Sequence, residues 1–218
     1  MNSTSGRWTK SGFTLIALLV IIAVLAILAA LLLPALASAE KKSSKIGCVN
    51  NLKQVGLAFR IWEGDNDDKL PMDVPAAKGG TLELVTGANT YRHFQVMSNE
   101  LSTPKILVCP NDTRTAAYNF ARLKNQNVSY FVGLDAKEEF PQRFLAGDRN
   151  LTGLTSPENG ILKLVPGDAV SWTSAIHVNQ GNIGLADGSV QQTTSTGLCQ
   201  FLKNSGDVTN TWRISLPE

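Results

Sequence analysis

The sequence predicts an α+β protein in which one long N-terminal helix precedes a small antiparallel β-sheet. Three observations lead to this class. An uncharged apolar segment covers residues 13–37, an apolar stripe with helical spacing continues to about residue 64, and short apolar runs bounded by turn residues follow in residues 65–218. The residues beyond the apolar segment are enough for one domain with a sizeable core.

The apolar segment, residues 13–37, contains no charged side chain. As a helix at about 1.5 Å per residue it would reach roughly 37 Å, which exceeds the hydrocarbon core of a bilayer at about 30 Å. Arg7 and Lys10 precede it, and the first acidic residue after it is Glu40. This charge bias predicts an N-terminus in the cytoplasm and the remaining chain outside it.

The helix is expected to continue beyond Glu40, because apolar residues recur every three or four positions on one stripe. We expect this stripe to pack on a sheet, and the acidic run Gly64-Asp65-Asn66-Asp67-Asp68 to end the helix. The stripe consists of Ile46, Val49, Leu52, Val55, Phe59 and Trp62.

Seven short apolar runs after the helix read as strands, because turn residues bound each of them. Residues 182–186 and 189–193 flank Asp187-Gly188, a dipeptide that favours a tight hairpin. Residues 66–102 give mixed signals, with one helical candidate at Tyr91–Asn99. The expected strands are Thr81–Val85, Lys105–Cys109, Val128–Leu134, Ile161–Val165, Asn182–Ala186, Ser189–Thr193 and Trp212–Leu216.

The sequence Ser11-Gly12-Phe13-Thr14-Leu15-Ile16 stands between the basic leader and the apolar segment, and Pro34 is residue 22 counted from Phe13. These features resemble type IV pilins and the pseudopilins of type II secretion systems. Those families share a short basic leader that ends in Gly, then Phe-Thr-Leu-Ile and a long apolar helix. The resemblance covers residues 7 to about 62.

The resemblance implies a pilin-like organisation: a leader peptide at 1–12, a transmembrane and filament-core helix at 13–37, an amphipathic continuation at 38–64 and an extracytoplasmic globular head at 65–218. It implies that a prepilin peptidase cleaves between Gly12 and Phe13 and N-methylates Phe13. The implied partners are further copies and other pseudopilins in a filament, and an inner-membrane assembly platform with its ATPase. The implied location is the bacterial inner membrane, crossed once, with the head in the periplasm.

One position departs from the family, because the fifth mature residue is Ala17 where the family usually has Glu. In the family this Glu is thought to neutralise the terminal ammonium of a neighbouring subunit in the apolar filament core, where an unpaired charge is costly. One interpretation is a minor subunit at a filament tip, since the first subunit has no predecessor whose amine must be paired. The other interpretation is family drift.

An ordinary secretory signal peptide is the competing interpretation of the N-terminus. Ala35-Leu36-Ala37 and Ala37-Ser38-Ala39 both satisfy the small-x-small cleavage pattern. However, the apolar segment is longer than the roughly 7–15 residues of a usual signal core. The pilin-like interpretation is therefore favoured.

The chain has three cysteines, so one is left over when two form a disulfide. Export permits disulfides. Cys48 lies on the predicted helix, and Cys109 opens a Cys-Pro-Asn-Asp turn. We pair these two because a bond between helix and head would stabilise a head that hangs from one helix, which leaves Cys199 as a free thiol.

His177, Asp187 and Gly188 fit the H-x₉-D-G pattern that is found in a large group of pilin-like proteins. One interpretation is a cation or ligand site with His177 and Asp187 as ligands. The other, which we favour, is that His177 hydrogen-bonds a loop while Asp187 supplies turn geometry.

A second polar cluster, Gly147-Asp148-Arg149-Asn150, follows the apolar Phe144-Leu145-Ala146 and reads as a turn or a ligand loop. The resemblance makes calcium a candidate cation, since major pseudopilins commonly bind it in a C-terminal loop. Calcium prefers carboxylate and carbonyl oxygens, so Asp148, Asp168 and Asp187 are candidate ligands. The spacing matches no calcium motif, and a solvated turn or salt-bridged loop is the favoured alternative.

No catalytic motif occurs in the sequence, and a net charge of +2 does not point to nucleic acid. We therefore expect a non-enzymatic filament subunit of a type II secretion or type IV pilus-like system, processed by prepilin peptidase, that needs no cofactor. The alternative is a membrane-anchored or secreted ligand-binding domain with the region of His177 and Asp187 as its site.

Overall fold

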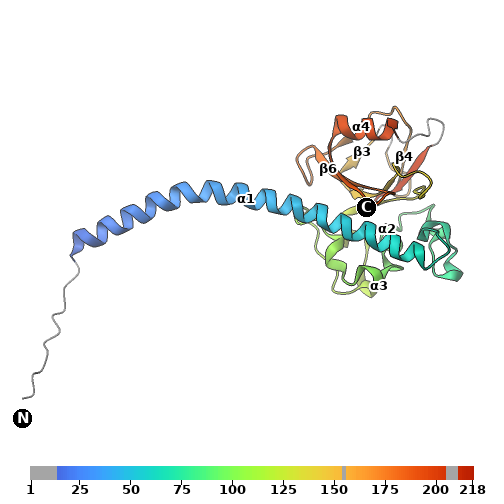
Figure 1. Ribbon diagram of the computed structural model, residues 1–218, viewed down its shortest axis with the longest axis horizontal. Coiled ribbons are helices and arrows are strands. Elements are labelled where there is room, and N and C mark those ends of the chain that lie inside the picture. Colours follow the sequence, from blue (N-terminus) through green and yellow to red (C-terminus); the bar gives the residue numbers. More distant parts are fainter. Residues whose placement is uncertain (1–13, 154–155, 205–210) are drawn as a thin grey trace, which may run out of the picture. The chain divides into compact units, whose positions relative to one another are not determined.

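The computed structural model describes residues 14–153, 156–204 and 211–218. The chain falls into two compact units, Met1–Ser43 and Ser44–Glu218; the second is called the head here. Helix α1 (Leu15–Gly64) begins in the first unit and ends in the head, and the sheet belongs to the head (Figure 1). The predicted class, α+β with a long N-terminal helix and a small antiparallel sheet, is confirmed.

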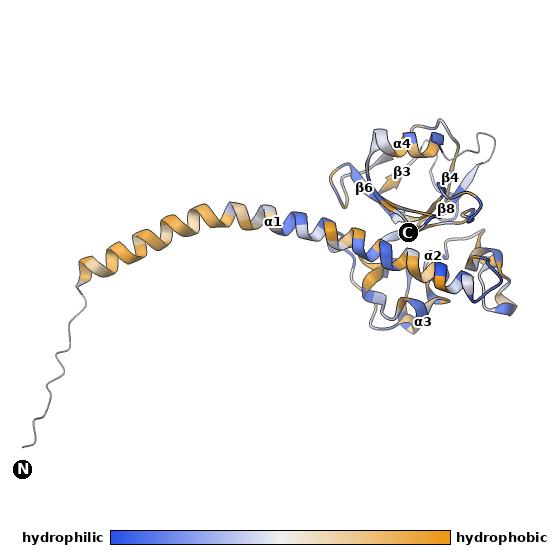
Figure 2. Ribbon diagram, in the orientation of Figure 1, coloured by the Kyte–Doolittle hydropathy of each residue, from blue (hydrophilic) through white to orange (hydrophobic). Residues whose placement is uncertain are grey.

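The first part of α1 is apolar on every side (Figure 2). Its side chains from Leu15 to Leu36 are exposed, except that Ala17 is partly buried. By length and composition, α1 is the one helix among the described residues that could cross a membrane. Pro34 lies inside the helix, where it removes one backbone hydrogen bond, and Ser38 Oγ donates to the Pro34 carbonyl at 3.0 Å.

The last five turns of α1 belong to the head and have one buried face. Leu52, Val55, Phe59 and Trp62 are buried, as the stripe predicts. Ile46 is 52% exposed, so its predicted place on the buried face is wrong. The buried face begins instead at Cys48, which is fully buried.

The main sheet of the head has the strand order β4-β8-β1-β2-β6-β7, and every neighbouring pair is antiparallel. A separate pair joins β3 (Leu151–Thr152) to β5 (Ser171–Trp172). The strands of the main sheet are β1 (Tyr130–Gly133), β2 (Phe144–Asp148), β4 (Ile161–Leu164), β6 (Gln180–Leu185), β7 (Val190–Thr194) and β8 (Trp212–Ser215).

Both faces of the main sheet are covered by core residues. Alternate residues of β1 enter different cores: Tyr130 packs with the α1 residues, whereas Phe131 packs with α4 (Ser195–Asn204) through Leu198 and Leu202. This burial on both sides explains why β1 reads as a continuous apolar run.

The hairpin at Asp187-Gly188 is confirmed between β6 and β7. Gly188 has φ of +85°, Leu185 N donates to Ser189 O at 2.9 Å, and Ser189 N donates to Asp187 Oδ1 at 2.8 Å. The predicted strands at residues 128–134, 161–165 and 212–216 are also present, with slightly different ends.

Two predicted strands are wrong, because local contacts hold both as short helices. Within Thr81–Val85 lies η3 (Leu82–Leu84), tied to the preceding loop by Leu82 N donating to Val74 O at 3.0 Å. The range Lys105–Cys109 overlaps η4 (Pro104–Leu107), which has Pro104 at its first position. The other short helices are η1 (Pro71–Asp73), η2 (Ala76–Lys78), α2 (Thr90–Gln95), α3 (Ser98–Leu101), η5 (Phe120–Arg122) and η6 (Asn125–Asn127).

Strand β2 and helix α4 are elements that the sequence prediction missed. The run at residues 147–150 read as a turn or loop, yet Gly147 and Asp148 end a strand inside the sheet. A side chain at Gly147 would lie 2.6 Å from the Phe131 ring, so glycine here serves close packing rather than a turn. The helical candidate at Tyr91–Asn99 corresponds to the two short helices α2 and α3.

Candidate functional site

A row of polar side chains crosses the sheet on the face that packs against α1. Asp148 ends β2 directly opposite Tyr130 of β1, and Asn182 of β6 lies against Asp148 on its other side. Opposite residues of antiparallel strands share one face of the sheet, so Asp148 lies on the side of Tyr130, which packs in the same core as Cys48. All four residues are fully buried.

Asp148, Asn182 and His177 form the centre of this site, which we call the His177 cluster together with the Cys48–Cys109 disulfide. Asp148 Oδ2 accepts from the backbone N of Asn182 at 2.7 Å and from its Nδ2 at 2.8 Å. His177 Nε2 lies 3.3 Å from the same carboxylate oxygen. Asp148 Oδ1 and Asn182 Oδ1 are buried and have no hydrogen-bond partner among the described residues.

His177 also contacts the disulfide, which confirms the predicted pairing of Cys48 with Cys109. His177 Nε2 lies 3.4 Å from Cys109 Sγ, and Asn111 Nδ2 lies 3.3 Å from His177 Nδ1. Asn182 Nδ2 lies 3.1 Å from Nε2, so both ring nitrogens face an amide nitrogen, and the tautomer decides which of them accepts. The Cys-Pro-Asn-Asp turn thus brings both a sulfur and an amide to the imidazole.

The loop after His177 has an uncommon backbone conformation. Val178 and Asn179 have φ of +50° and +60°, a region that is costly for a β-branched residue such as valine. Val178 is 74% exposed while His177 beside it is buried. The two left-handed residues therefore turn the chain so that the imidazole enters the core and the valine faces solvent.

Burial shifts the pKa values of the two titratable groups in opposite directions. It raises the pKa of Asp148 to about 7, against the hydrogen bonds from Asn182. It lowers the pKa of His177, with the charge of Lys45 adding to this effect and that of Asp112 opposing it. At neutral pH the imidazole is therefore neutral, and Asp148 titrates near physiological pH.

A partly buried ion pair lies beside the Cys-Pro-Asn-Asp turn. Arg149 donates to Asp112 through Nε at 2.8 Å and through its terminal nitrogen at 2.7 Å. Burial alone would raise the pKa of Asp112, but the hydrogen bonds from Arg149 and Ser129 lower it overall. The salt-bridged alternative for the residues around Arg149 is therefore the one present.

The structure joins His177 to Asp148 rather than to Asp187, its neighbour in the H-x₉-D-G pattern. Asp187 lies in the β6–β7 turn, where its carboxylate accepts from Ser189 N and its carbonyl accepts from Arg60 at 2.8 Å. The second motif residue, Gly188, supplies the positive φ of that turn. These contacts match the alternative in which His177 holds a loop and Asp187 supplies turn geometry.

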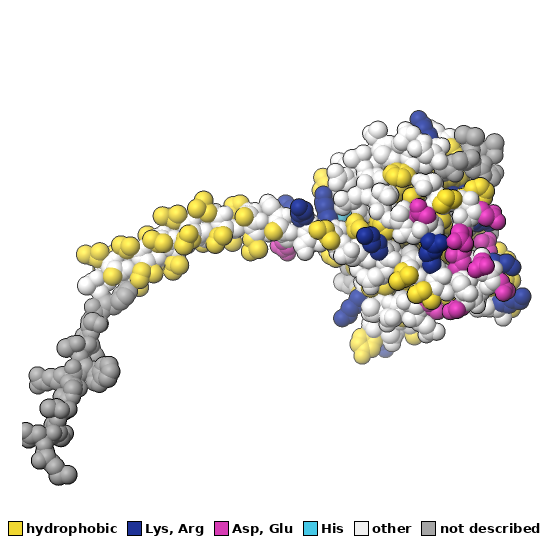
Figure 3. Space-filling model, viewed as in Figure 1, with side chains coloured by type: hydrophobic (Ala, Val, Ile, Leu, Met, Phe, Trp, Pro, Cys, Tyr) yellow, Lys and Arg dark blue, Asp and Glu magenta, His cyan; other side chains and the backbone are white. Residues whose placement is uncertain are grey.

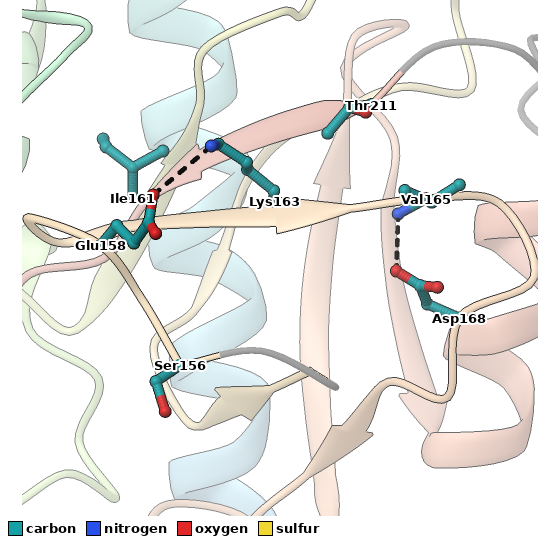
Figure 4. Close-up of a pocket in the computed structure, with 7 residues that line it drawn as sticks. All are labelled: Ser156, Glu158, Ile161, Lys163, Val165, Asp168 and Thr211. Carbon is teal, nitrogen blue, oxygen red and sulfur yellow. Dashed lines mark hydrogen bonds and ion pairs between the residues drawn. The ribbon is translucent and has the colours of Figure 1, made fainter.

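The three candidate calcium ligands do not come together. Asp148 is in the His177 cluster and Asp187 is in the hairpin turn, while Asp168 Oδ2 accepts from Val165 N at 2.9 Å in the turn after β4 (Figure 4). Among the described residues, the group with metal-ligand geometry is Cys48, Cys109 and His177, and it contains none of the three aspartates. A shared calcium site of these aspartates is therefore a prediction that the structure corrects.

The pocket around Asp168 carries little chemistry of its own. The ion pair of Lys163 with Glu158 spans 3.5 Å and both side chains are largely exposed, so water screens their attraction. Figure 4 shows this pair and Asp168 at different ends of the pocket. Its lining consists of Ser156, Glu158, Ile161, Lys163, Val165, Asp168 and Thr211.

Acidic side chains gather on one part of the head surface (Figure 3). Burial, together with the other acids nearby, raises the pKa values of Glu63 and Asp73 there. No three of these carboxylates form a group with metal-ligand spacing among the described residues. A pocket of the head contains these acidic side chains and is lined by Glu63, Asp67, Asp68, Lys69, Leu70, Asp73, Lys137, Glu138 and Glu139.

The N-terminal site residues lie partly beyond the described chain. Gly12 and Phe13, the predicted cleavage and methylation residues, are outside the described residues. Ala17 and Pro34 lie on α1, and Ala17 N donates to Thr14 Oγ1 at 3.3 Å. The exposed apolar surface of α1 is thus the second candidate functional surface, besides the His177 cluster.

The geometry of the His177 cluster differs from that of a catalytic triad. In a triad the carboxylate orients the imidazole through one nitrogen while the nucleophile contacts the other. Here Asp148 and Cys109 both face Nε2 of His177, and the sulfur is held in a disulfide. What the cluster can do chemically is hold a proton between two buried groups and present sulfur and nitrogen ligands.

No protein-family model, curated protein or solved structure matches this chain. The residues of the chain and their geometry are therefore the basis for a functional proposal.

Proposed function

We propose that the chain is a structural subunit of a type II secretion or type IV pilus-like filament, held in the membrane by the first part of α1 and assembled through it. The observation that carries the proposal is the sequence Gly12-Phe13-Thr14-Leu15-Ile16 at the start of an apolar helix. The side chains of that helix from Leu15 to Leu36 are not buried within the chain.

An exposed apolar surface of this length needs a partner other than water. Full burial of one leucine, isoleucine or valine side chain contributes about 1.5–3 kcal/mol relative to exposure. Lipid supplies that burial before assembly, and the equivalent helices of neighbouring subunits supply it in a filament. The apolar surface therefore stays away from water in both states, and packing between the helices drives polymerisation while the heads form the outer surface.

The partners of this role are a prepilin peptidase, other subunits, and a membrane platform with its ATPase. The ATPase of the platform supplies the energy for assembly, and the subunit forms the filament. The geometry of the His177 cluster supports a non-enzymatic head, because its sulfur is bonded and its imidazole is enclosed.

The test is the N-terminal sequence and mass of the mature protein, purified from membranes of its host with and without the prepilin peptidase. The proposal expects N-methyl-Phe13 in the presence of the peptidase and an intact leader without it. A terminus at Ser38 or Glu40 in both strains would instead identify a secreted domain, for which the ligand of the head becomes the question.

Ala17 favours a minor subunit within this function, since a first subunit has no preceding amine to pair. The Ala17→Glu variant restores the usual carboxylate, and its incorporation is measured by pull-down of assembled filaments. Charge pairing predicts that more of the variant enters the filament body. Equal incorporation of variant and wild type would remove the charge-pairing argument and leave family drift.

A further inference from the structure

The His177 cluster brings together three side chains of the kinds that bind thiophilic metals. The Sγ atoms of Cys48 and Cys109 and a ring nitrogen of His177 all lie within 4.8 Å of one another. All three residues are buried. The two sulfurs form a disulfide, so they can act as thiolate ligands only after reduction.

The distances around His177 Nε2 fit the edges of a tetrahedral site. With bonds of about 2.3 Å from zinc to sulfur and about 2.0–2.1 Å to nitrogen or oxygen, the expected edges are roughly 3.6 Å between sulfur and nitrogen and roughly 3.4 Å between nitrogen and oxygen. Cys109 Sγ lies 3.4 Å from Nε2, and Asp148 Oδ2 lies 3.3 Å from it. The edge between Cys109 and His177 is therefore already present, and Cys48 supplies a third ligand when the sulfurs separate.

The surroundings also suit a metal-bound imidazole. A ligating histidine usually donates its other N–H to an oxygen. The side-chain amide of Asn111 lies 3.3 Å from Nδ1 and can present its oxygen there by turning over, since its nitrogen and oxygen are assigned from the hydrogen-bond network.

We propose that the chain, with its disulfide reduced, binds one thiophilic divalent cation of the zinc class through Cys48, Cys109 and His177. A dithiol reductant supplies two electrons and two protons to the S–S bond, which becomes two thiols while the dithiol becomes a disulfide. Metal binding then releases the two thiol protons as the thiolates form. Disulfide and metal exclude each other, and the inference does not depend on the filament role.

The test uses the full chain in detergent, reduced with a phosphine that offers no thiol, and titrated with Co²⁺. Cobalt bound to thiolate gives a sulfur-to-metal charge-transfer band, and tetrahedral geometry gives intense d–d absorption. We expect both bands, saturating at one Co²⁺ per chain and removed by Zn²⁺. The oxidised chain is expected to show neither band.

Matched variants identify the ligands. Cys48→Ser or Cys109→Ser is expected to abolish the charge-transfer band, and His177→Gln to weaken Co²⁺ binding by about 10-fold or more, by analogy with the losses seen on perturbing metal sites. Cys199→Ser is the control, because Cys199 is the free thiol outside the cluster. A reduced wild type without the band, or a band that is lost in Cys199→Ser and kept in Cys48→Ser, would overturn the proposal.

A second measurement avoids variants that fail to fold. The reduced wild-type chain is alkylated with and without Zn²⁺, and mass spectrometry reports the rate at each cysteine. The proposal expects Zn²⁺ to slow the alkylation of Cys48 and Cys109, because their thiolates are held by the metal, and to leave the rate at Cys199 unchanged. Equal rates with and without Zn²⁺ at all three cysteines would contradict it.

Discussion

The two parts of α1 have similar helical geometry but opposite relations to the rest of the chain. From Leu15 to Leu36 the side chains are apolar on every side, and none is fully buried. From Ser44 to Gly64 the helix has one buried face, fixed at Cys48 by the disulfide and continued by Phe59. The comparison shows that one helix can pack into the core of the head at one end and expose an apolar surface that needs burial elsewhere at the other end.

The largest expected effect is on the buried face in the head. Phe59 is fully buried and packs edge-on against Phe94 at a ring distance of 6.1 Å. Phe59→Ala should lower the free energy of unfolding by about 3–5 kcal/mol, because it removes an aromatic ring from the core. Thermal unfolding of the full chain in detergent, followed by tryptophan fluorescence, measures this loss.

The matched control is Leu57→Ala on the same helix, since Leu57 is 59% exposed. Its effect should stay within about 0.5 kcal/mol. Equal destabilisation by the two variants would mean that the two faces of the helix do not differ as described.

The next largest effect is expected on membrane insertion, when a charge is introduced in each part of α1. Leu25 is 58% exposed and Leu57 is 59% exposed, so neither packs in the head. If the first part lies in a membrane, Leu25→Asp should cost about 2.5–3.5 kcal/mol of insertion free energy, and Leu57→Asp should cost almost nothing. The fraction of protein retained in membranes after alkaline extraction measures this difference.

A result in which both aspartate variants remain equally in the membrane fraction would show that the first part of α1 is not the anchor. Loss of both would indicate instead that Leu57 also lies against lipid or another subunit.

The smallest expected effect concerns pH and the cluster that holds the second part of α1. Asp148 has its pKa raised from 3.8 to about 7, so it contributes stability that is present at low pH and is lost as pH rises through about 7. His177 has its pKa lowered from 6.5, so it contributes stability that is present above pH 6.5 and is lost as pH falls. In the wild type the two contributions to stability therefore oppose each other below pH 6.5, where both groups titrate differently in the folded and unfolded chain.

Variants of the two groups should therefore change the pH dependence with opposite signs. Relative to the wild type, His177→Gln should lose stability as pH rises toward 6.5, and Asp148→Asn should gain it as pH rises toward 7. Each change in slope is at most about 1.4 kcal/mol per pH unit, the value for one proton. Unfolding midpoints of the full chain across this pH range provide the measurement, and slopes of the same sign would contradict the assignment.

The parts of the fold that the sequence predicts well are those that local patterns determine. The apolar stripe predicts α1, and the Asp187-Gly188 dipeptide predicts the β6–β7 hairpin, since both depend on neighbours in sequence. The Cys48–Cys109 bond was predicted because each cysteine had a recognisable local setting. Leu198 and Leu202 also have helical spacing, so the pattern of α4 was present in the sequence.

The candidate site could not be predicted in the same way, because strand register brings it together. Asp148 contacts Asn182 only because β2 pairs with β6. In the sequence, the dipeptide Gly147-Asp148 is typical of a turn, although it ends a strand. The motif suggested Asp187 as the partner of His177, whereas the actual partner comes from a different strand. Short apolar runs such as Thr81–Val85 misled for a related reason, since nothing in them reveals whether a strand neighbour exists.

The measurement that tests the filament proposal most directly is the content of filaments isolated from the host. Quantitative mass spectrometry would compare a strain carrying the wild-type chain with one carrying Phe13→Ala, which alters the residue proposed to become the first of the mature chain. The account predicts that the wild-type chain is present in the filaments, at low copy number if Ala17 marks a minor subunit, and that the variant is depleted. If the chain is absent from filaments in both strains and remains in the membrane as a separate protein, the filament role is contradicted.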